Sequence, residues 1–443
     1  MAIPVVLSQV SHTMVALADT LMIGQTNDVS SLAAASLANN LFSLAIVFGI
    51  GISYGATPKV AESHARGETE TCSLILKNSL INNLLWSILL VGVLLALLPF
   101  ASHLGQVPEV LRRAIPFFKL LTFSLPGILL FQAFKQFFDG LGNTKPGMVF
   151  SLSANLLNVI LNYLLIFGHF GFPEMGIIGA GIATLISRIA MGVALGIYFF
   201  VSPSTKKFRA HFVGKWVEPT YLLLLNRIGL PISLQFLFEV GAFSFMAILI
   251  GKMGAPALAA HQVVITIASA TYMMSSGLAA AATVRVGHFV GLGNRAMIRL
   301  SGIRSFQIVL VFMGTMAVLL ILFRNTLPLA FINNAEVVDA SARLLLIAGF
   351  FQISDGIQVV GLGCLRGLSD VKIPTWFTFM AYWVIAIPFG YVFGIFLGYG
   401  LEATWWALSL GLTISALLML FRFFSLCKTV SLDKNDEAYS NTL

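Results

Sequence analysis

Charged residues are scarce in this chain. Of its 443 residues, 10% are charged and 58% are hydrophobic, whereas a soluble domain usually carries about 25% charged residues. A soluble protein of this composition would expose large apolar patches, so the composition favours a lipid environment. The apolar runs are continuous and reach roughly 20 residues, which is enough to cross a bilayer. They lack the alternation of a transmembrane β-barrel. The sequence therefore predicts an all-α polytopic membrane protein.

Cysteines and catalytic motifs are also sparse. The three cysteines, Cys72, Cys364 and Cys427, have the spacing of neither a disulfide framework nor a metal site. No Walker-type phosphate loop, HExxH motif or nucleophile triad occurs. The formal charge of +8 does not indicate nucleic-acid binding, because that requires a soluble basic face. We therefore expect no enzyme, no cofactor and no structural metal.

Twelve membrane spans are predicted from the apolar runs. Their expected residues are 2–24, 31–58, 74–100, 114–138, 146–168, 176–201, 221–251, 256–283, 301–323, 341–363, 373–397 and 402–426. An even number of spans leaves both termini on one side. Connections after even-numbered spans, with the C-terminal end, hold 19 Lys and Arg residues, against five after odd-numbered spans. By the positive-inside rule, both termini are expected in the cytoplasm, in a cell inner membrane.

The two halves of the chain resemble each other at an offset of about 227 residues. Pro4 corresponds to Pro231, Lys59 to Arg285 and Gly140 to Gly367. Six spans in each repeat give parallel repeats, which are related by an axis along the membrane normal. We therefore predict two six-helix lobes related by a pseudo-twofold axis, with the following divisions: an N-terminal lobe at 1–201, a cytoplasmic linker at 202–220, a C-terminal lobe at 221–426 and a cytoplasmic polar tail at 427–443.

Three carboxylates fall inside the predicted spans: Asp19, Glu239 and Asp355. A carboxylate at the bilayer centre costs at least about 2.5–3.5 kcal/mol, so such residues usually face a cavity and serve transport. Burial disfavours the charged form of a carboxyl group, so each can take up a proton or hold Na⁺. The alternative is a carboxylate fixed by a nearby basic residue or a helix cap, and it is strongest for Asp19, which lies nearer a span end.

Asparagines form a stripe on the fifth predicted span. Asn155, Asn158 and Asn162 are three, four and seven residues apart, so they share one helix face. Their amides could bond a carboxylate, a water or an ion. They could also join neighbouring helices, as polar residues often do in membranes.

At this point the residues resemble a known family, the multidrug and toxic compound extrusion (MATE) transporters, and within it the NorM branch. The resemblance is carried by DTLMIG at Asp19, FFDGLGNTKP from Phe137, the segment from Leu156 to Thr184, FEV at Phe238, LAAHQV at Leu258, VRVGHFVG at Val284 and SDGIQVVGLGCLRG at Ser354. It implies two six-helix lobes that form a V, with a cavity that alternates between the two membrane faces.

The same resemblance implies roles for particular residues. Glu239, Asp355 and Asp19 would bind the coupling cation or proton, with Na⁺ possible at Glu239 and Asp355. Asn155, Asn158, Asn162 and Thr184 would supply polar groups of the substrate cavity, and Pro4 would bend the first helix. Some relatives have an aspartate where this chain has Asn162, which leaves Asp19 as the only acid expected in the N-terminal cavity.

Three functional classes compete on this evidence. We favour a monomeric secondary antiporter that exports small organic cations in exchange for Na⁺ or H⁺. A lipid-linked oligosaccharide flippase of the same superfamily should need basic cavity residues for pyrophosphate, whereas the deep charges predicted here are acidic. A channel or receptor lacks support, because the repeat and the midplane acids favour alternating access.

Overall fold

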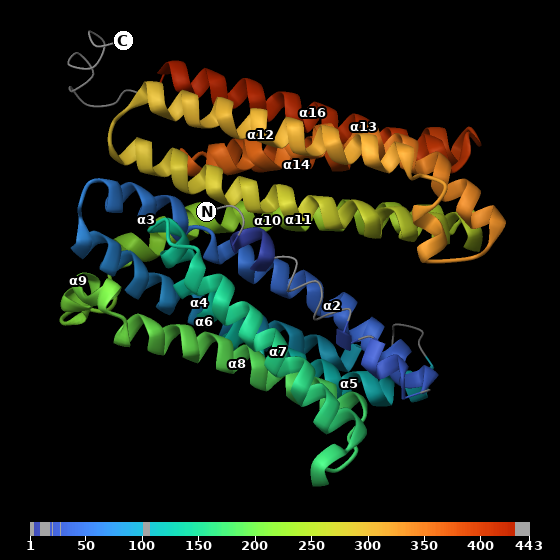
Figure 1. Cartoon of the computed structure of the whole chain (residues 1–443), viewed down its shortest axis with the longest axis horizontal. Coiled ribbons are helices and arrows are strands. Elements are labelled where there is room, and N and C mark those ends of the chain that lie inside the picture. The colour runs from blue at the N-terminus through green and yellow to red at the C-terminus, as the bar shows by residue number, and fades with distance from the viewer. Residues whose placement is uncertain (1–3, 9–17, 20, 27, 101–106, 430–443) are drawn as a thin grey trace. The chain divides into compact units, whose positions relative to one another are not determined.

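The structure is a computed structural model that describes residues 4–8, 18, 19, 21–26, 28–100 and 107–429. Within these residues the regular structure is helical throughout and contains no strand (Figure 1). The chain divides into two compact units, the first ending at Ser233 and the second beginning at Leu234.

The first unit contains the helices that precede this division. Residues 4–8 and 21–24 are also helical. Its helices are α2 (Val29–Ser53), α3 (Ala56–Ala65), α4 (Thr69–Leu97), α5 (Pro108–Phe123), α6 (Leu125–Gly140), α7 (Lys145–Phe167), η2 (His169–Gly171), α8 (Ile177–Val201), η3 (Pro203–Thr205), α9 (Lys206–Arg209), η4 (Ala210–Phe212) and the first part of α10 (Pro219–Gly251).

The second unit begins within α10 and runs to the C-terminus. Its further helices are α11 (Ala255–Gly291), α12 (Arg295–Leu322), η5 (Leu327–Ala330), α13 (Ala335–Gly367), α14 (Lys372–Phe379), η6 (Met380–Ala386), α15 (Ile387–Phe389), η7 (Gly390–Phe396) and α16 (Gly400–Thr429). Both η6 and η7 are π-helical turns, so the stretch from α14 to η7 is one continuous but irregular helix.

Eleven helical stretches of the described residues are long and apolar enough to cross a membrane. They match eleven of the twelve predicted spans, while much of the predicted span 2–24 lies outside the described residues. Several helices continue beyond the prediction; α11, for example, ends at Gly291 rather than at 283. Hydropathy marks the hydrocarbon core, whereas a helix can continue into the polar headgroup region.

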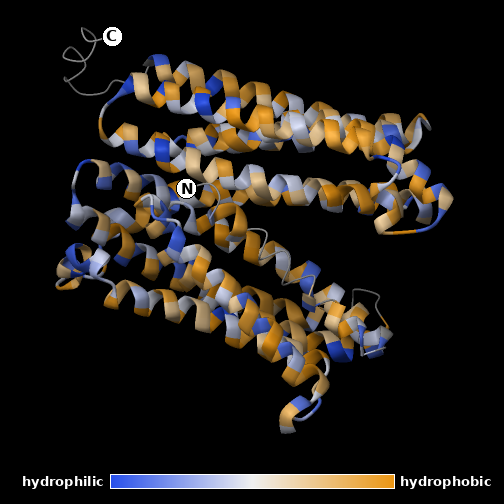
Figure 2. Cartoon of the chain, viewed as in Figure 1, coloured by the Kyte–Doolittle hydropathy of each residue, from blue (hydrophilic) through white to orange (hydrophobic). Residues whose placement is uncertain are grey.

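Hydrophobic residues predominate along the helices, and many hydrophilic residues lie at helix ends and in loops (Figure 2). Ile88, Val311 and Phe421 are 60%, 72% and 74% exposed. Such surfaces would be costly in water, and they fit lipid.

The predicted linker 202–220 is a folded segment. Phe208 and Phe212 are buried in the core of the first unit. Ser73 on α4 donates to the carbonyl of Phe208 at 2.9 Å, and Lys77 donates to the carbonyl of Val213 at 3.3 Å. The segment thus packs with the first unit. At the other end of the chain, α16 reaches Thr429, past the predicted start of the tail at 427, and residues 430–443 lie outside the described residues.

Small residues bring α6 and α8 together. A Cβ on Gly192 would lie 2.6 Å from the carbonyl oxygen of Gly127. Close backbone contact through small residues is a common way of packing membrane helices, because lipid supplies little hydrophobic force between them. This crossing fixes α8, which carries Thr184 and Arg188.

Candidate functional site

In the first unit, Asp19 is held by residues of α7 and α8. Asn162 donates from Nδ2 to Asp19 Oδ1. Thr184 donates from Oγ1 to Asp19 Oδ2 at 3.4 Å. A carboxylate from the first helical segment is therefore fixed by an amide and a hydroxyl that lie more than 140 residues away in sequence.

The asparagine stripe forms part of the same network. Asn162 Nδ2 also donates to Asn158 Oδ1 at 3.2 Å, and Asn158 Nδ2 donates to Thr184 Oγ1 at 3.4 Å. Asn158, Asn162 and Thr184 are only 2%, 0% and 4% exposed. Asn162 Oδ1 is buried and accepts no hydrogen bond from any residue that the structure describes, so this oxygen is an acceptor beside the carboxylate. Asn155, on the same helix face, is partly buried.

Arg188 lies one turn after Thr184 on the same face of α8, and the sequence did not identify it as a site residue. Its Nη1 donates to Ser124 Oγ at 2.7 Å, and its guanidinium lies 5.0 Å from the centre of the Phe42 ring. It also attracts Asp19 electrostatically. The spacing of four residues from Thr184 is the signal that could have located it.

Pro4 is the first described residue of the chain. It is partly buried and opens the helical residues 4–8. Residues 9–17 of the same predicted span lie outside the described residues, so the bend of the first helix at Pro4 remains a prediction.

In the second unit, Glu239 on α10 and Asp355 on α13 are buried, at 6% and 4% exposure. They are close enough to repel each other electrostatically. Tyr382 on η6 lies near both carboxylates, and its hydroxyl donates to Gln358 Oε1 at 3.1 Å. Two carboxylates and a phenol thus interact electrostatically within the second unit, and either carboxylate could accept a proton or attract a hard cation such as Na⁺.

Arg366 is a basic neighbour of Glu239 that the sequence did not identify. It lies in the last turn of α13 and attracts Glu239 electrostatically. Its Nη2 donates to Gln235 Oε1 at 3.2 Å, one turn before Glu239 on α10, and its guanidinium lies 4.9 Å from the centre of the Phe236 ring. The sequence suggested that the deep charges of this chain are acidic. The structure adds a basic group in each unit, because Arg188 interacts electrostatically with Asp19 and Arg366 with Glu239.

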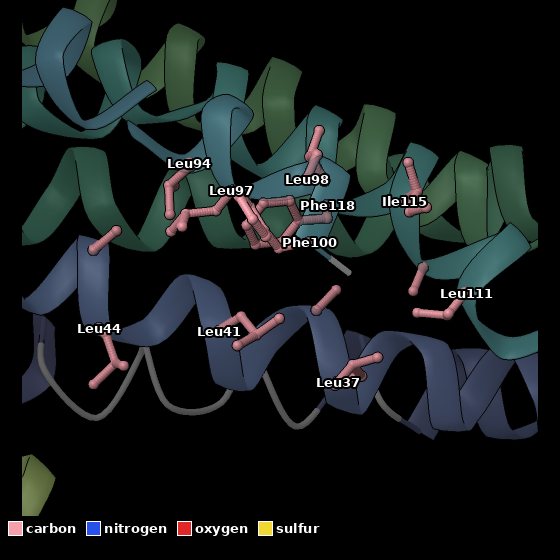
Figure 3. A pocket seen from close by; sticks show the side chains of 13 residues that line it. Leu37, Leu41, Leu44, Leu94, Leu97, Leu98, Phe100, Leu111, Ile115 and Phe118 are labelled. Atoms are coloured by element: carbon pink, nitrogen blue, oxygen red, sulfur yellow. The ribbon is translucent and has the colours of Figure 1, made fainter. Parts of the chain in front are cut away.

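A separate pocket of about 320 Å³ in the first unit has a wholly apolar lining (Figure 3). Side chains from α2, α4 and α5 surround it, among them Leu37, Leu41, Leu94, Leu97, Ile115 and Phe118. Its described lining residues include no charged or hydrogen-bonding side chain, so they suit an apolar group rather than a coupling ion.

Comparison with known proteins identifies the family. The family model described as MatE matches residues 4–164 and again residues 231–392. The second match begins 227 residues after the first, at the offset of the internal repeat. The chain belongs to the MATE family. This result confirms the predicted family, and with it a transporter rather than an enzyme.

Curated relatives of this MATE protein carry multidrug-resistance names. It is 30% identical to the multidrug resistance protein NorM of Photobacterium profundum, over 95% of this chain and 93% of that protein. It is 31% identical to the multidrug resistance protein MdtK of Yersinia pseudotuberculosis serotype O:1b, with the same coverage.

Solved MATE structures share the fold of this protein. The crystal structure of the eukaryotic MATE transporter AtDTX14 superimposes with a TM-score of 0.86 at 21% identity, covering 96% of this chain and 94% of that one. The bent form of the Vibrio cholerae MATE transporter VcmN gives a TM-score of 0.85 at 19% identity, covering 97% and 95%. The predicted fold, twelve membrane helices in two lobes that repeat in parallel, is confirmed.

Proposed function

We propose that this MATE protein is a secondary antiporter that exports organic cations and drugs in exchange for Na⁺ or H⁺ by alternating access. The observation that carries the proposal is that each unit holds acidic side chains among polar partners: Asp19 is bonded by Asn162 and Thr184, and Glu239 and Asp355 lie buried on membrane-length helices. The multidrug-resistance names of the relatives support the same class of substrate.

Glu239 and Asp355 are the proposed site of the coupling ion. Two like charges that repel each other in a buried site favour the uptake of a positive ion or a proton, because either relieves the repulsion. Arg366, whose positive charge acts on Glu239, would limit how many further positive charges the site accepts. Filling and emptying this site would supply the difference in free energy between the two access states.

Asp19, with Asn155, Asn158, Asn162 and Thr184, is the proposed polar site of the first unit for an organic cation or a proton. The carboxylate would attract the positive charge, and Oδ1 of Asn162, which has no partner among the described residues, could accept a hydrogen bond from a bound group. Pro4 would let the first helix bend as this site changes charge. A substrate is released only if its affinity differs between the two states.

The proposal also specifies a location: a bacterial inner membrane, with both termini in the cytoplasm and the protein acting as a monomer. The relatives reported above give the flippase alternative no support, so we do not propose it.

Efflux of ethidium from proteoliposomes tests this function. The purified protein is reconstituted, ethidium is loaded, and either a Na⁺ gradient or a pH gradient is applied alone. We expect one of the two gradients to drive efflux faster than in protein-free liposomes. Efflux that follows neither gradient would refute antiport, and the gradient that works identifies the ion.

A further inference from the structure

Arg188 places a fixed positive charge at the polar site of the first unit. It lies one turn from Thr184, whose hydroxyl bonds Asp19, so the guanidinium and the carboxylate belong to one site. Its position is set independently of Asp19, because Ser124 accepts a hydrogen bond from it at 2.7 Å and Phe42 lies under it. Ser124 stands at the junction of α5 and α6 and is fully buried.

We propose that Arg188 is a built-in counter-ion of Asp19, which restricts the first unit to organic cations of a single positive charge. This inference rests on the proposed function, in which Asp19 attracts the substrate. With Asp19 ionised, the two side chains cancel, and a monocation brings the site to one net positive charge. A dication would bring it to two, in a membrane unit where the screening of charge by solvent is weak.

Coulomb's law sets the scale of this selectivity. The guanidinium repels a second substrate charge that lies about 10–12 Å away. At an effective dielectric constant of about 20, this repulsion raises the dissociation constant of the dication by roughly 10-fold. A purely structural arginine, which only joined α8 to Ser124 and Phe42, would affect mono- and dications alike.

Equilibrium binding of two dyes tests the proposal. Ethidium carries one positive charge and propidium carries two on the same ring system, so the ratio of their dissociation constants isolates the effect of the second charge. The ratio is measured by dye fluorescence with purified protein, without any gradient. Failure of the proposed antiport would appear separately, as absent efflux in proteoliposomes.

Removing the charge should relax the selectivity. In Arg188→Gln, we expect the propidium-to-ethidium ratio to fall roughly 10-fold, whereas Arg188→Lys, which keeps the charge, should retain the ratio of the unmodified protein. The matched control is Arg112→Gln, which removes the charge of an arginine whose side chain is 75% exposed and should leave the ratio unchanged.

A second variant covers the case in which Arg188→Gln does not fold. Ser124→Asp keeps the arginine and places a carboxylate beside its guanidinium, so it should lower the ratio in the same direction. A ratio within twofold of that of the unmodified protein in Arg188→Gln, or in Ser124→Asp where only that variant folds, overturns the proposal. An equal fall in Arg188→Lys also overturns it, because the charge would then not be the cause.

Discussion

The ion pair between Lys135 and Asp139 makes a sharp prediction about stability. Both residues lie on α6, one turn apart, and they are only 5% and 3% exposed. Lys135 Nζ lies 2.7 Å from Asp139 Oδ2, whereas Asp139 Oδ1 is buried and has no hydrogen-bond partner within the described parts of the chain. Each charge therefore depends on the other for compensation.

Removing one partner should leave the other charge buried and uncompensated. Breaking a buried pair in this way costs about 3–5 kcal/mol, whereas replacing both partners by apolar residues is often nearly neutral. We therefore expect Asp139→Leu to lower the free energy of unfolding by about 3–5 kcal/mol. The double variant Lys135→Met/Asp139→Leu should recover most of that loss.

The assay is denaturant unfolding of the purified protein in detergent, analysed as a double-mutant cycle. The matched control is Asp339→Leu, because Asp339 pairs with Arg343 at the same spacing but its side chain is 71% exposed. An exposed pair is worth roughly 0–1 kcal/mol. The reasoning about the buried pair is wrong if Asp139→Leu lowers the free energy of unfolding no more than Asp339→Leu does. It is also wrong if the losses measured for Lys135→Met and for Asp139→Leu simply add in the double variant.

Three further predictions concern topology, the first unit and helix packing. A cysteine introduced at Lys206 should react with an impermeant reagent only after the membrane is permeabilised, and labelling from outside would overturn the predicted orientation. Asp19→Asn cannot change its charge, so efflux per molecule should be low and independent of pH; an unchanged pH profile would remove Asp19 from the mechanism. Gly192→Ala should destabilise the protein by about 1–3 kcal/mol, because its Cβ meets the backbone of α6, whereas Gly92→Ala, where nothing lies within 4 Å, should fold normally in thermal unfolding assays.

The membrane spans and the repeat were predictable because both depend on local sequence. Hydropathy alone located eleven of the helices now described, and paired motifs located the repeat. The linker was not predictable in the same way, because its folding depends on contacts with α4. Ser73 and Lys77, which hold it, are more than 130 residues away in sequence.

The candidate site was predictable only in part. Helical periodicity placed Asn158 and Asn162 on one face, and the structure brings that face to Asp19. Periodicity could not show which member of the stripe bonds Asp19, since the neighbouring helices decide which side chains meet. It also missed Arg188 and Arg366, because each meets its carboxylate on a different helical segment.

Coupled efflux by the two carboxylate variants of the second unit tests the central claim most directly. Glu239→Gln and Asp355→Asn each remove one charge from the proposed ion site while keeping its shape. Ethidium efflux is measured in proteoliposomes under whichever gradient drives the unmodified protein, normalised to the protein incorporated. The account predicts that each variant inserts normally and loses gradient-driven efflux. Efflux at the unmodified rate in both variants would contradict it.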